Sequence, residues 1–410
     1  MIGVIADDVT GATDVAAALS RAGLRTVLVL DAGAPLVADA ADADAVVIGL
    51  KTRSIAPHDA VSQSLAALDA LELAGAERFY LKYCSTFDST AEGNIGPVTE
   101  ALAERLNERL IVTTPASPLH GRTVYQGHLF VGSDPLHETH MRHHPITPMH
   151  DSSVPRLLGP QVGGTIDVLS LQTVHRGASA VDARIREAAE AGVRHLIADA
   201  VAEGDLDSIA AALHDAVLVA GSAGLIGALA RRIPASGRPL STPGEGRTAL
   251  IAGSCSRRTL EQIDRFQKAG GESFPLVADD QSTAEGLAAD ALAWWDRLPD
   301  GSSALIYSSQ PAEERAAGMP GVGALYEETA GLVARGLAER GLRRMLIAGG
   351  ETSGQVVKAL GTHTAVVGEE VATGVPWIHD TRQDLHLALK SGNFGGPDLF
   401  VDVALAGGER

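Results

Sequence analysis

Two adjacent carboxylates, Asp7 and Asp8, follow a short apolar run at the start of the chain. The run Ile2–Ala6 predicts a strand buried on both faces, and the Ala-rich residues 14–22 predict a helix. Acids at such a junction lie at the carboxyl edge of a sheet, where open α/β sheets bind ligands. There an Asp can act as a general base, orient a hydroxyl or hold Mg²⁺. The alternative is that Asp8 or Thr10 only caps the helix.

Lysine is scarce: five lysines stand among 33 basic residues, and three of them end predicted strands. These three are Lys51, Lys82 and Lys390. An ammonium group at the carboxyl edge of a sheet suits a carboxylate or phosphate, so we expect Lys51 and Lys82 to bind an anionic substrate. For Lys390 the alternative stays open that its ammonium only extends toward solvent.

A cluster of hydroxyls with one acid, KYCSTFDST, follows the strand that ends at Lys82. It runs into residues 93–97, GNIGP, a turn that opens a helix with Pro in its first turn. Hydroxyls and free helix N–H groups would hold an anionic or polyol ligand, although an elaborate loop is the alternative. Cys84 is interpreted as a small buried residue, not a nucleophile. The predicted substrate ligands here are Arg53, Ser85, Thr86 and Asp88.

Six of the fourteen histidines lie between His128 and His150. This segment contains no HExxH motif and is punctuated by Pro and Gly, which is typical of a loop. A structural metal site is therefore the weaker interpretation. We expect a loop over the substrate that contributes His128 and Arg142, with a plain surface loop as the alternative.

Two strand–loop–helix junctions in the second half are rich in Gly and hydroxyls: IAGSCSRRTLEQI and LIAGGETSGQVVKAL. Glycines let a phosphate approach the backbone, and helix N-termini supply N–H donors. Neither junction is a P-loop, and neither matches the dinucleotide fingerprint G-x-G-x-x-G. With residues 390–395, KSGNFG, as a third junction, they predict a nucleotide site; tight turns are the alternative for the last.

Strand-like runs, such as residues 78–82, alternate with helical patterns, such as residues 257–268 and 354–360, along the whole chain, which predicts an α/β fold with mostly parallel sheets. The segment 233–247, IPASGRPLSTPGEGR, interrupts the alternation and predicts a linker. We therefore expect two α/β lobes, one over residues 1–232 and the other over residues 248–410, with the predicted nucleotide site in the second. The active site is expected in the cleft between the lobes.

Composition excludes several classes of protein. The formal net charge of −18 over 410 residues argues against nucleic acid or an anionic membrane surface as a partner. Two cysteines make no disulfide framework, and the N-terminus shows no signal peptide, so we expect a cytoplasmic protein. The oligomeric state stays open, with a homodimer as one possible form.

Taken together, the motifs resemble the four-carbon acid sugar kinase family. The resemblance covers both lobes in order, through ADDVTGATD, KYCSTFDST with GNIGPV, GRTVYQGHLFVG, HPITPM, GSCS, GGETSG and ALKSGNFG. KYCSTFDST and the GHLFVG…HPITPM block look like the 3-oxo-tetronate 4-kinase branch. The D-threonate and D-erythronate kinase branches usually read closer to K-x-D-S-T-x-R-G-N at the first of these places.

This resemblance implies an ATP-dependent kinase that phosphorylates the terminal hydroxyl of a four-carbon sugar acid with ATP and Mg²⁺. It also implies that residues 1–232 form a sugar-acid-binding domain and residues 248–410 a nucleotide-binding domain. It implies 3-oxo-tetronate as substrate, with D-threonate or D-erythronate as the alternative. We expect Asp8 or Asp7 to be the catalytic base and Lys51, Arg53 and Lys82 to be anion partners. The ATP contacts implied by motif match are Ser254, Ser256, Gly349, Gly350, Glu351, Thr352, Ser353, Asn393 and Gly395.

Two other classes of protein share parts of this pattern. A non-catalytic sugar-acid sensor could have two lobes, but it would not need the phosphate loops of the second lobe. A dehydrogenase could have the α/β lobes, but the missing dinucleotide fingerprint counts against it.

Overall fold

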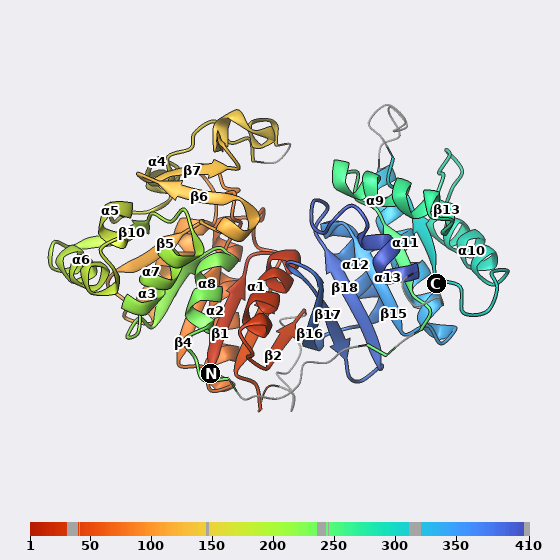
Figure 1. The fold of residues 1–410 in the computed structure, drawn as a ribbon, viewed down its shortest axis with the longest axis horizontal. Coiled ribbons are helices and arrows are strands. Elements are labelled where there is room, and N and C mark those ends of the chain that lie inside the picture. Colours follow the sequence, from red (N-terminus) through yellow and green to blue (C-terminus); the bar gives the residue numbers. More distant parts are fainter. Residues whose placement is uncertain are drawn as a thin grey trace. The chain divides into compact units, whose positions relative to one another are not determined.

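The computed structural model describes residues 1–30, 40, 42–144, 147–235, 243–244, 246–310 and 321–405. The chain divides into two compact units, Met1–Arg238 and Pro239–Arg410, each of which is described by itself (Figure 1). Much of the expected linker 233–247 lies outside the described residues, so its bounds and a shared cleft stay predictions. None of the described helices is long and apolar enough to cross a membrane.

The first unit is built on a parallel sheet in the order β2-β3-β1-β4-β11-β5-β10-β9. Its strands are β1 (Ile2–Ala6), β2 (Thr26–Val29), β3 (Ala45–Gly49), β4 (Arg78–Lys82), β5 (Ile111–Thr114), β9 (Thr165–Leu169), β10 (Val193–Ala198) and β11 (Leu218–Gly221). Its helices are α1 (Val9–Arg21), α2 (Pro57–Leu73), α3 (Ile95–Arg105), α4 (Val154–Leu158), α5 (Leu171–Val174), α6 (Ala178–Glu190), α7 (Glu203–Ala212) and α8 (Ala223–Ala230).

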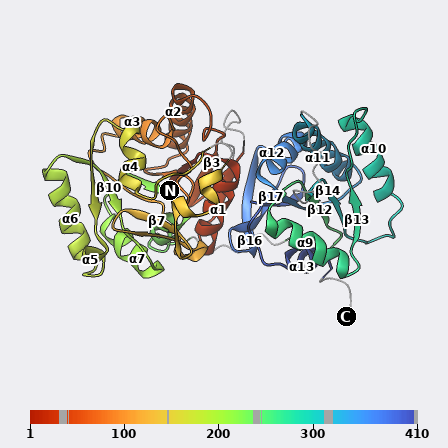
Figure 2. The same ribbon diagram turned by 90° about the horizontal axis from the view of Figure 1, so that it is seen from above.

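Helices cover both faces of this sheet. Helices α1, α8 and α7 contact one another in a row on one face, and α2 packs beside α3 on the other (Figure 2). Strand β1 is buried along its whole length, as its run of apolar residues predicts. Its neighbours β3 and β4 are parallel to it, so residues after all three strands meet at one edge.

Helix α1 begins at Val9, five residues before the predicted start at Asp14. The reason is local: Asp8 is extended, and its side chain accepts a hydrogen bond from the backbone N–H of Gly11. A capped first turn therefore takes up the residues that the sequence assigned to a loop.

A small antiparallel sheet that the sequence analysis did not predict lies within the His-rich region. It consists of β6 (Arg122–Tyr125), β7 (His128–Val131) and β8 (Asp134–Pro135). Val124 of β6 bridges Ala200, just after β10, so this sheet lies at the carboxyl edge of the main sheet (Figure 1). The next residues form short 3₁₀ helices at Leu136–Glu138 and His140–His143.

The second unit has a mixed sheet in the order β13-β14-β12-β15-β18-β17-β16. Its strands are β12 (Ala249–Ala252), β13 (Glu272–Pro275), β14 (Ala304–Tyr307), β15 (Arg344–Ala348), β16 (Thr364–Ala372), β17 (Val375–Asp380) and β18 (Leu385–Lys390). Its helices are α9 (Arg257–Lys268), α10 (Ala284–Trp295), α11 (Val322–Glu339), α12 (Gly350–Leu360) and α13 (Leu399–Leu405). Helices α10, α11 and α12 contact one another on one face, and α9 packs against α13 on the other (Figure 2).

Two details of this unit differ from the sequence analysis. Strand β17 was not predicted, and it pairs antiparallel with both β16 and β18, because tight turns connect the three strands. Helix α12 begins at Gly350, four residues before the predicted start, so GETS forms its first turn. The mostly parallel α/β class is confirmed in both units.

Candidate functional site

The carboxylates Asp7 and Asp8 lie where β1 ends, and the structure shows that both already have partners. Asp8 accepts hydrogen bonds from the Gly11 backbone N–H (2.8 Å) and from the Thr10 hydroxyl (2.7 Å). The capping role weighed for Asp8 is therefore real. The backbone carbonyl of Asp7 accepts a hydrogen bond from the backbone N–H of Thr52, which brings the loop after β3 to the end of β1.

Arg53 joins the two carboxylates. Its guanidinium donates to both oxygens of Asp7, at 2.9 and 2.7 Å, and to Asp8 at 2.8 Å. Its remaining nitrogen lies 4.0 Å from Asp88. A bidentate guanidinium–carboxylate pair is a strong, directional contact. Arg53 is thus first a partner of acids, which leaves at most one side of its guanidinium for an anionic ligand.

The two acids differ in acidity. Burial would raise the pKa of Asp8, but Arg53, Lys82 and two hydrogen bonds outweigh burial and lower it. For Asp7, burial outweighs the guanidinium and raises the pKa above its usual value. Asp7 therefore accepts a proton more readily than Asp8, although Arg53 occupies both of its oxygens.

Lys82 ends β4 beside these acids, and only 3% of its surface is exposed. Among the described residues, none forms an ion pair or hydrogen bond with its ammonium. A Cβ at Gly11 would lie 2.9 Å from the Lys82 nitrogen, so the absent side chain at Gly11 leaves the space that this ammonium occupies. Lys51, by contrast, is exposed in the loop after β3. Lys82 is therefore the better-placed cation for an anionic ligand.

A narrow slot of about 20 Å³ opens beside Asp7 and Arg53, and Lys82 does not line it. Polar side chains from four segments line the slot. They include Asp7, Thr52, Arg53, Asp88, Ser89 and Asn94. Asp88 accepts a hydrogen bond from Thr86 at 2.7 Å, and the thiol of Cys84 lies 2.9 Å from the Thr86 hydroxyl. Burial raises the pKa of Cys84, so its thiol stays protonated, in agreement with a non-nucleophilic residue. Ser85 is half-buried and does not line the slot.

Sequence reasoning did not single out Asn94. Its amide NH₂ donates to the carbonyls of Thr52 (2.6 Å) and Ile55 (2.9 Å), which can only accept. Its amide oxygen must therefore face the other way, where it is buried without a hydrogen-bond partner in the described chain. Such an oxygen is costly unless a ligand or water donates to it. Its place in the GNIG turn was the one available signal.

A second polar group, also missed, continues from α1. Asp14 lies 3.9 Å from the imidazole of His120, whose other ring nitrogen is 2.9 Å from the Ser117 hydroxyl. Burial raises the pKa of Asp14 despite the nearby His120 and Lys82. This carboxylate faces Lys82 as well as His120, so it adds to the negative charge around that ammonium.

His128, the predicted substrate ligand of the His-rich region, lies in β7. Its ring nitrogen is 2.9 Å from the carbonyl of Gln126. Buried Asp199 fixes this hairpin by accepting the backbone N–H groups of Gln126 and Gly127, both at 2.8 Å. Arg142 is exposed and donates to the His137 carbonyl at 3.3 Å. Residues 145–146 of the HPITPM motif lie outside the described residues.

A cavity of about 460 Å³ opens in the second unit at the carboxyl ends of β12, β14 and β15. Its volume lies in the range of about 300–1,000 Å³ that small-molecule and cofactor sites occupy. Four segments line it: the loop after β12, the residues after β14, the first turns of α11, and the β15–α12 junction. Five of the predicted ATP contacts line it, namely Ser254, Gly349, Gly350, Glu351 and Thr352.

The other four predicted ATP contacts do not line this cavity. Ser256 caps α9, and its hydroxyl donates to the Gly392 carbonyl at 2.6 Å. Ser353 is buried in α12, Asn393 is exposed, and Gly395 has a positive φ of 83° in the turn after β18. Lining residues that the sequence analysis missed include Tyr326 and Glu327 of α11.

Backbone geometry explains the glycines at the β15–α12 junction. Gly349 has φ 131°, a value that side-chain-bearing residues rarely adopt, and a Cβ there would lie 3.2 Å from the Ser254 nitrogen. The two junctions therefore pack backbone to backbone. With α12 beginning at Gly350, free N–H groups of its first turn face the cavity, an arrangement that suits phosphate.

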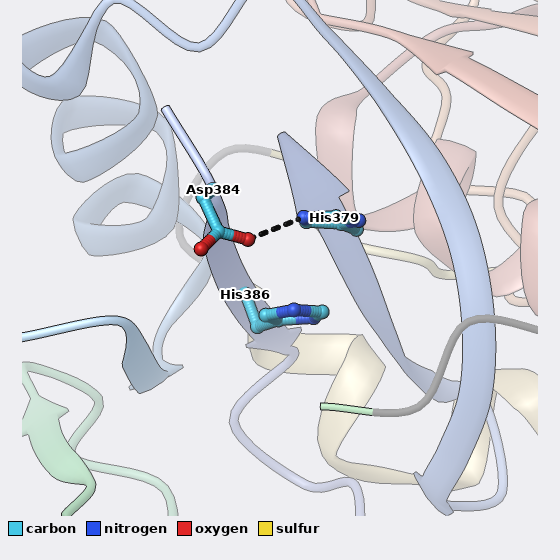
Figure 3. Close-up of side chains that lie close together, drawn as sticks. All are labelled: His379, Asp384 and His386. Atoms are coloured by element: carbon cyan, nitrogen blue, oxygen red, sulfur yellow. Dashed lines mark hydrogen bonds and ion pairs between the residues drawn. The ribbon is translucent and has the colours of Figure 1, made fainter. Parts of the chain in front are cut away.

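Within the described residues, one group of three side chains could in principle hold a metal ion: His379, Asp384 and His386 (Figure 3). His379 lies 3.1 Å from Asp384, and the two imidazole rings stack at 4.1 Å between centroids, only 5° from parallel. A metal ion binds in the plane of each imidazole ligand at about 2.0–2.1 Å, so two parallel stacked rings cannot hold the same ion. The cluster also lies at the amino end of β18, the opposite edge from the cavity.

Comparison with known families and proteins gives a consistent result. A sugar-binding N-terminal domain model matches residues 2–229, and a nucleotide-binding C-terminal domain model matches residues 249–400. Proteins named 3-oxo-tetronate kinase from Pectobacterium atrosepticum and Cupriavidus necator are each 43% identical over 98% of this chain and 97% and 96% of their own. One from Salmonella typhimurium is 42% identical over 98% of this chain and 97% of its own.

Solved structures agree in fold. A crystal structure of a Salmonella typhimurium protein matches with a TM-score of 0.91 at 40% identity, covering 99% of both chains. One of a Haemophilus influenzae protein matches with a TM-score of 0.80 at 37% identity, covering 97% of this chain and 98% of that one.

Proposed function

Because the chain belongs to the 3-oxo-tetronate kinase family, we propose that it transfers the γ-phosphoryl group of ATP to the 4-hydroxyl of 3-oxo-tetronate. The product is 3-oxo-tetronate 4-phosphate. The observation that carries this proposal is the pairing of two unlike sites, a charged slot in the sugar-binding unit and a glycine-lined cavity in the nucleotide-binding unit.

In the nucleotide-binding unit, the first turn of α12 and the loop after β12 would hold the phosphates. Glycines at 349 and 350 let them approach the backbone, and the helix N-terminus favours their negative charge. The Tyr326 side chain, which also lines the cavity, would offer an aromatic surface for the base.

Oxygen donors in the same cavity suit Mg²⁺, which prefers carboxylates and substrate phosphates. The carboxylates of Glu327 and Glu351 and the hydroxyl of Thr352 line the cavity and would hold the ion. Bound there, Mg²⁺ would supply charge neutralisation of the phosphates. The chain's own backbone N–H groups and glycines do the rest of the positioning.

In the sugar-binding unit, Lys82 would bind the substrate carboxylate, because none of the described residues forms an ion pair or hydrogen bond with its buried ammonium. Asn94 and Asp88 would accept hydrogen bonds from substrate hydroxyls at the slot. Asp7 or Asp8 would orient the attacking 4-hydroxyl. Phosphoryl transfer passes through a loose transition state that depends more on alignment than on a strong base, so a carboxylate already bound to Arg53 is adequate.

A coupled ADP-release assay with ATP and Mg²⁺ tests this proposal across a panel of four-carbon acids. The panel holds 3-oxo-tetronates generated in situ, D-threonate, D-erythronate and their L forms. We expect turnover with the 3-oxo acids alone. Turnover with a plain tetronate would move the chain to the D-threonate or D-erythronate branch, and no ADP with any acid would favour a sugar-acid sensor.

Two further proposals concern the protein in its setting. A cytoplasmic location is supported by the free thiols of Cys84 and Cys255. A homodimer is proposed as the assembly, which light scattering of the purified protein would test directly.

A further inference from the structure

Lys390, the last residue of β18, differs from the other lysines of the nucleotide-binding unit. Lys268 and Lys358 are exposed, whereas no part of Lys390 is exposed. Its ammonium donates to the Thr259 hydroxyl (3.0 Å) and to the backbone carbonyls of Gly392 (3.0 Å) and Ser391 (3.3 Å). All three partners are neutral oxygens. A buried ammonium held only by neutral oxygens keeps an uncompensated positive charge.

Three donors converge on the Gly392 carbonyl. Besides the Lys390 ammonium, the hydroxyls of Ser256 (2.6 Å) and Thr259 (2.9 Å) donate to it. Both hydroxyls belong to the start of α9, so the turn after β18 is fixed to that helix. A carbonyl with three donors, one of them charged, is held firmly in place.

This arrangement reaches the wall of the nucleotide cavity through direct contacts. Gly392 packs so closely on Ser254 that a Cβ at position 392 would collide with the Ser254 hydroxyl. The Ser256 N–H also donates to that hydroxyl at 3.2 Å. Ser254 lines the cavity, so the position of this side chain depends on the turn that Lys390 holds.

Among the described residues, no carboxylate pairs with the Lys390 ammonium to balance its charge. Burial and, to a smaller extent, the positive charge of Arg258 on α9 together lower the pKa of Lys390 to about 7. Arg258 itself pairs with Glu261 at 2.8 Å. The other nearby acids also have partners: Asp264 pairs with Lys268, and Asp398, before α13, pairs with Arg265.

On the remaining elements packed against β18, the charged groups have partners other than Lys390 or are exposed to solvent. On β17, His379 pairs with Asp384 and stacks on His386, and Asp380 accepts the amide of Gln383. Arg344 on β15 donates to the carbonyls of Gly244 and Gly246 at the amino edge. On α12, Glu351 is exposed at the cavity and Lys358 is exposed near the other end of the helix.

We propose that Lys390 is a positioning residue of the nucleotide site: its ammonium fixes the Gly392 carbonyl, and with it Ser254, and its charge is balanced by the phosphates of the bound nucleotide. The inference rests on the proposed function, because it takes the cavity to hold ATP or ADP. Its consequence is measurable: since phosphates favour the charged form of Lys390, nucleotide binding near neutral pH takes up protons.

Titration calorimetry of the full-length protein with MgADP at pH 7.5, in two buffers of different ionisation enthalpy, measures this uptake. We expect the wild type to take up roughly three-quarters of a proton per nucleotide, because a lysine with a pKa near 7 is mostly neutral at pH 7.5 and becomes charged when the phosphates bind. Lys390→Met is expected to abolish the uptake and to weaken MgADP binding at least about tenfold, the size of a lost charged hydrogen bond. Its KM for the sugar acid should stay within about twofold, since that site lies in the other unit.

Lys358→Met is the matched control, because it removes an exposed lysine of the same unit. It should keep both the uptake and the affinity of the wild type. If Lys390→Met does not fold, the proton uptake of the wild type still tests the role of Lys390. A second variant, Thr259→Val, removes one of the hydroxyls that donate to the Gly392 carbonyl. It should weaken MgADP binding and keep the proton uptake.

The outcomes separate the two proposals. Wild-type protein that binds MgADP without taking up protons, or a folded Lys390→Met variant that binds MgADP as the wild type does, overturns the role of Lys390 alone. Wild-type protein that binds no MgADP overturns the proposed function and this inference with it.

Discussion

The two candidate sites use opposite means to hold an anionic ligand. In the first unit, charged side chains do the work: Asp7, Asp8 and Arg53 form one ion-pair group beside the buried ammonium of Lys82. In the second unit, backbone N–H groups, glycines and hydroxyls face the cavity, and the buried Lys390 lies behind its wall. Fixed charges select a small molecule by its pattern of hydroxyls and carboxylate, whereas a backbone cradle suits any phosphate chain of the right length.

Removing charge should therefore damage the first site most. Asp8→Asn keeps the size and a cap acceptor for α1 but removes the negative charge next to Arg53. We expect kcat to fall by about 10²–10⁴-fold, the usual range for a positioned acid–base group, with KM for ATP unchanged. Steady-state kinetics with both substrates measures it. If Asp8→Asn and Asp7→Asn each leave turnover intact, neither carboxylate acts on the attacking hydroxyl.

Adding one carbon should damage the second site most. Gly349→Ala forces a strained φ and brings a Cβ against the Ser254 nitrogen, so we expect KM for ATP to rise at least about tenfold, the effect of strain of about 1–3 kcal/mol. Gly361→Ala is the matched control at the other end of α12, because φ is also positive there but nothing lies within 4 Å of the new Cβ. Equal kinetics for the two variants would show that the close packing at Gly349 does not shape the nucleotide site.

A neutral residue in the charged slot sharpens the comparison. Asn94→Ala removes the one buried acceptor of the slot that has no partner among the described residues, so KM for the sugar acid should rise by about tenfold. KM for ATP should not change. A thermal melt separates this effect from the loss of the bonds to Thr52 and Ile55. If the variant is destabilised but its KM for the sugar acid is unaltered, Asn94 only shapes the loop after β3.

The last prediction concerns the dependence of stability on pH in the nucleotide-free protein. The pKa of Lys390 falls from 10.5 in the unfolded chain to about 7 in the folded one, so between these values the unfolded chain binds more protons. The free energy of unfolding contributed by this group therefore rises as pH increases from about 7 toward 10. Urea melts should show a steeper rise for wild type than for Lys390→Met, and Lys358→Met should match wild type. Parallel curves for all three would contradict the lowered pKa.

The features of the fold and of the candidate sites that the sequence predicts are those determined by residues close together in the chain. Strand β4 and helix α9 agree with prediction to the residue, because an apolar run and an amphipathic period are read from neighbours in the chain. The predicted start of helix α1 is too late because the sequence analysis treats capping and chemistry at Asp8 as alternatives. In the structure the Asp8 side chain both caps the helix and pairs with Arg53.

Contacts between distant residues could not be read in this way. Arg53 was expected to face an anionic ligand, but it pairs with acids 46 and 45 residues away in the chain. The amide oxygen of Asn94 and the ammonium of Lys390 became informative only when their neighbours were known. Strand β17 was missed because its antiparallel pairing within a parallel sheet follows from two tight turns, not from its own composition.

The group formed by Asp7, Arg53 and Asp8 has a consequence for how this protein can evolve. Losing one partner of a fully buried ion pair leaves an uncompensated charge and costs about 3–5 kcal/mol. The side chains of this group are 14–26% exposed, so the cost here is smaller but still a large share of the stability of a typical domain. A single substitution at Arg53 would therefore leave two carboxylates without their cation at once. We expect these three positions to be substituted together or not at all. New substrate preferences would then arise first at the neighbouring slot residues, which can change one by one.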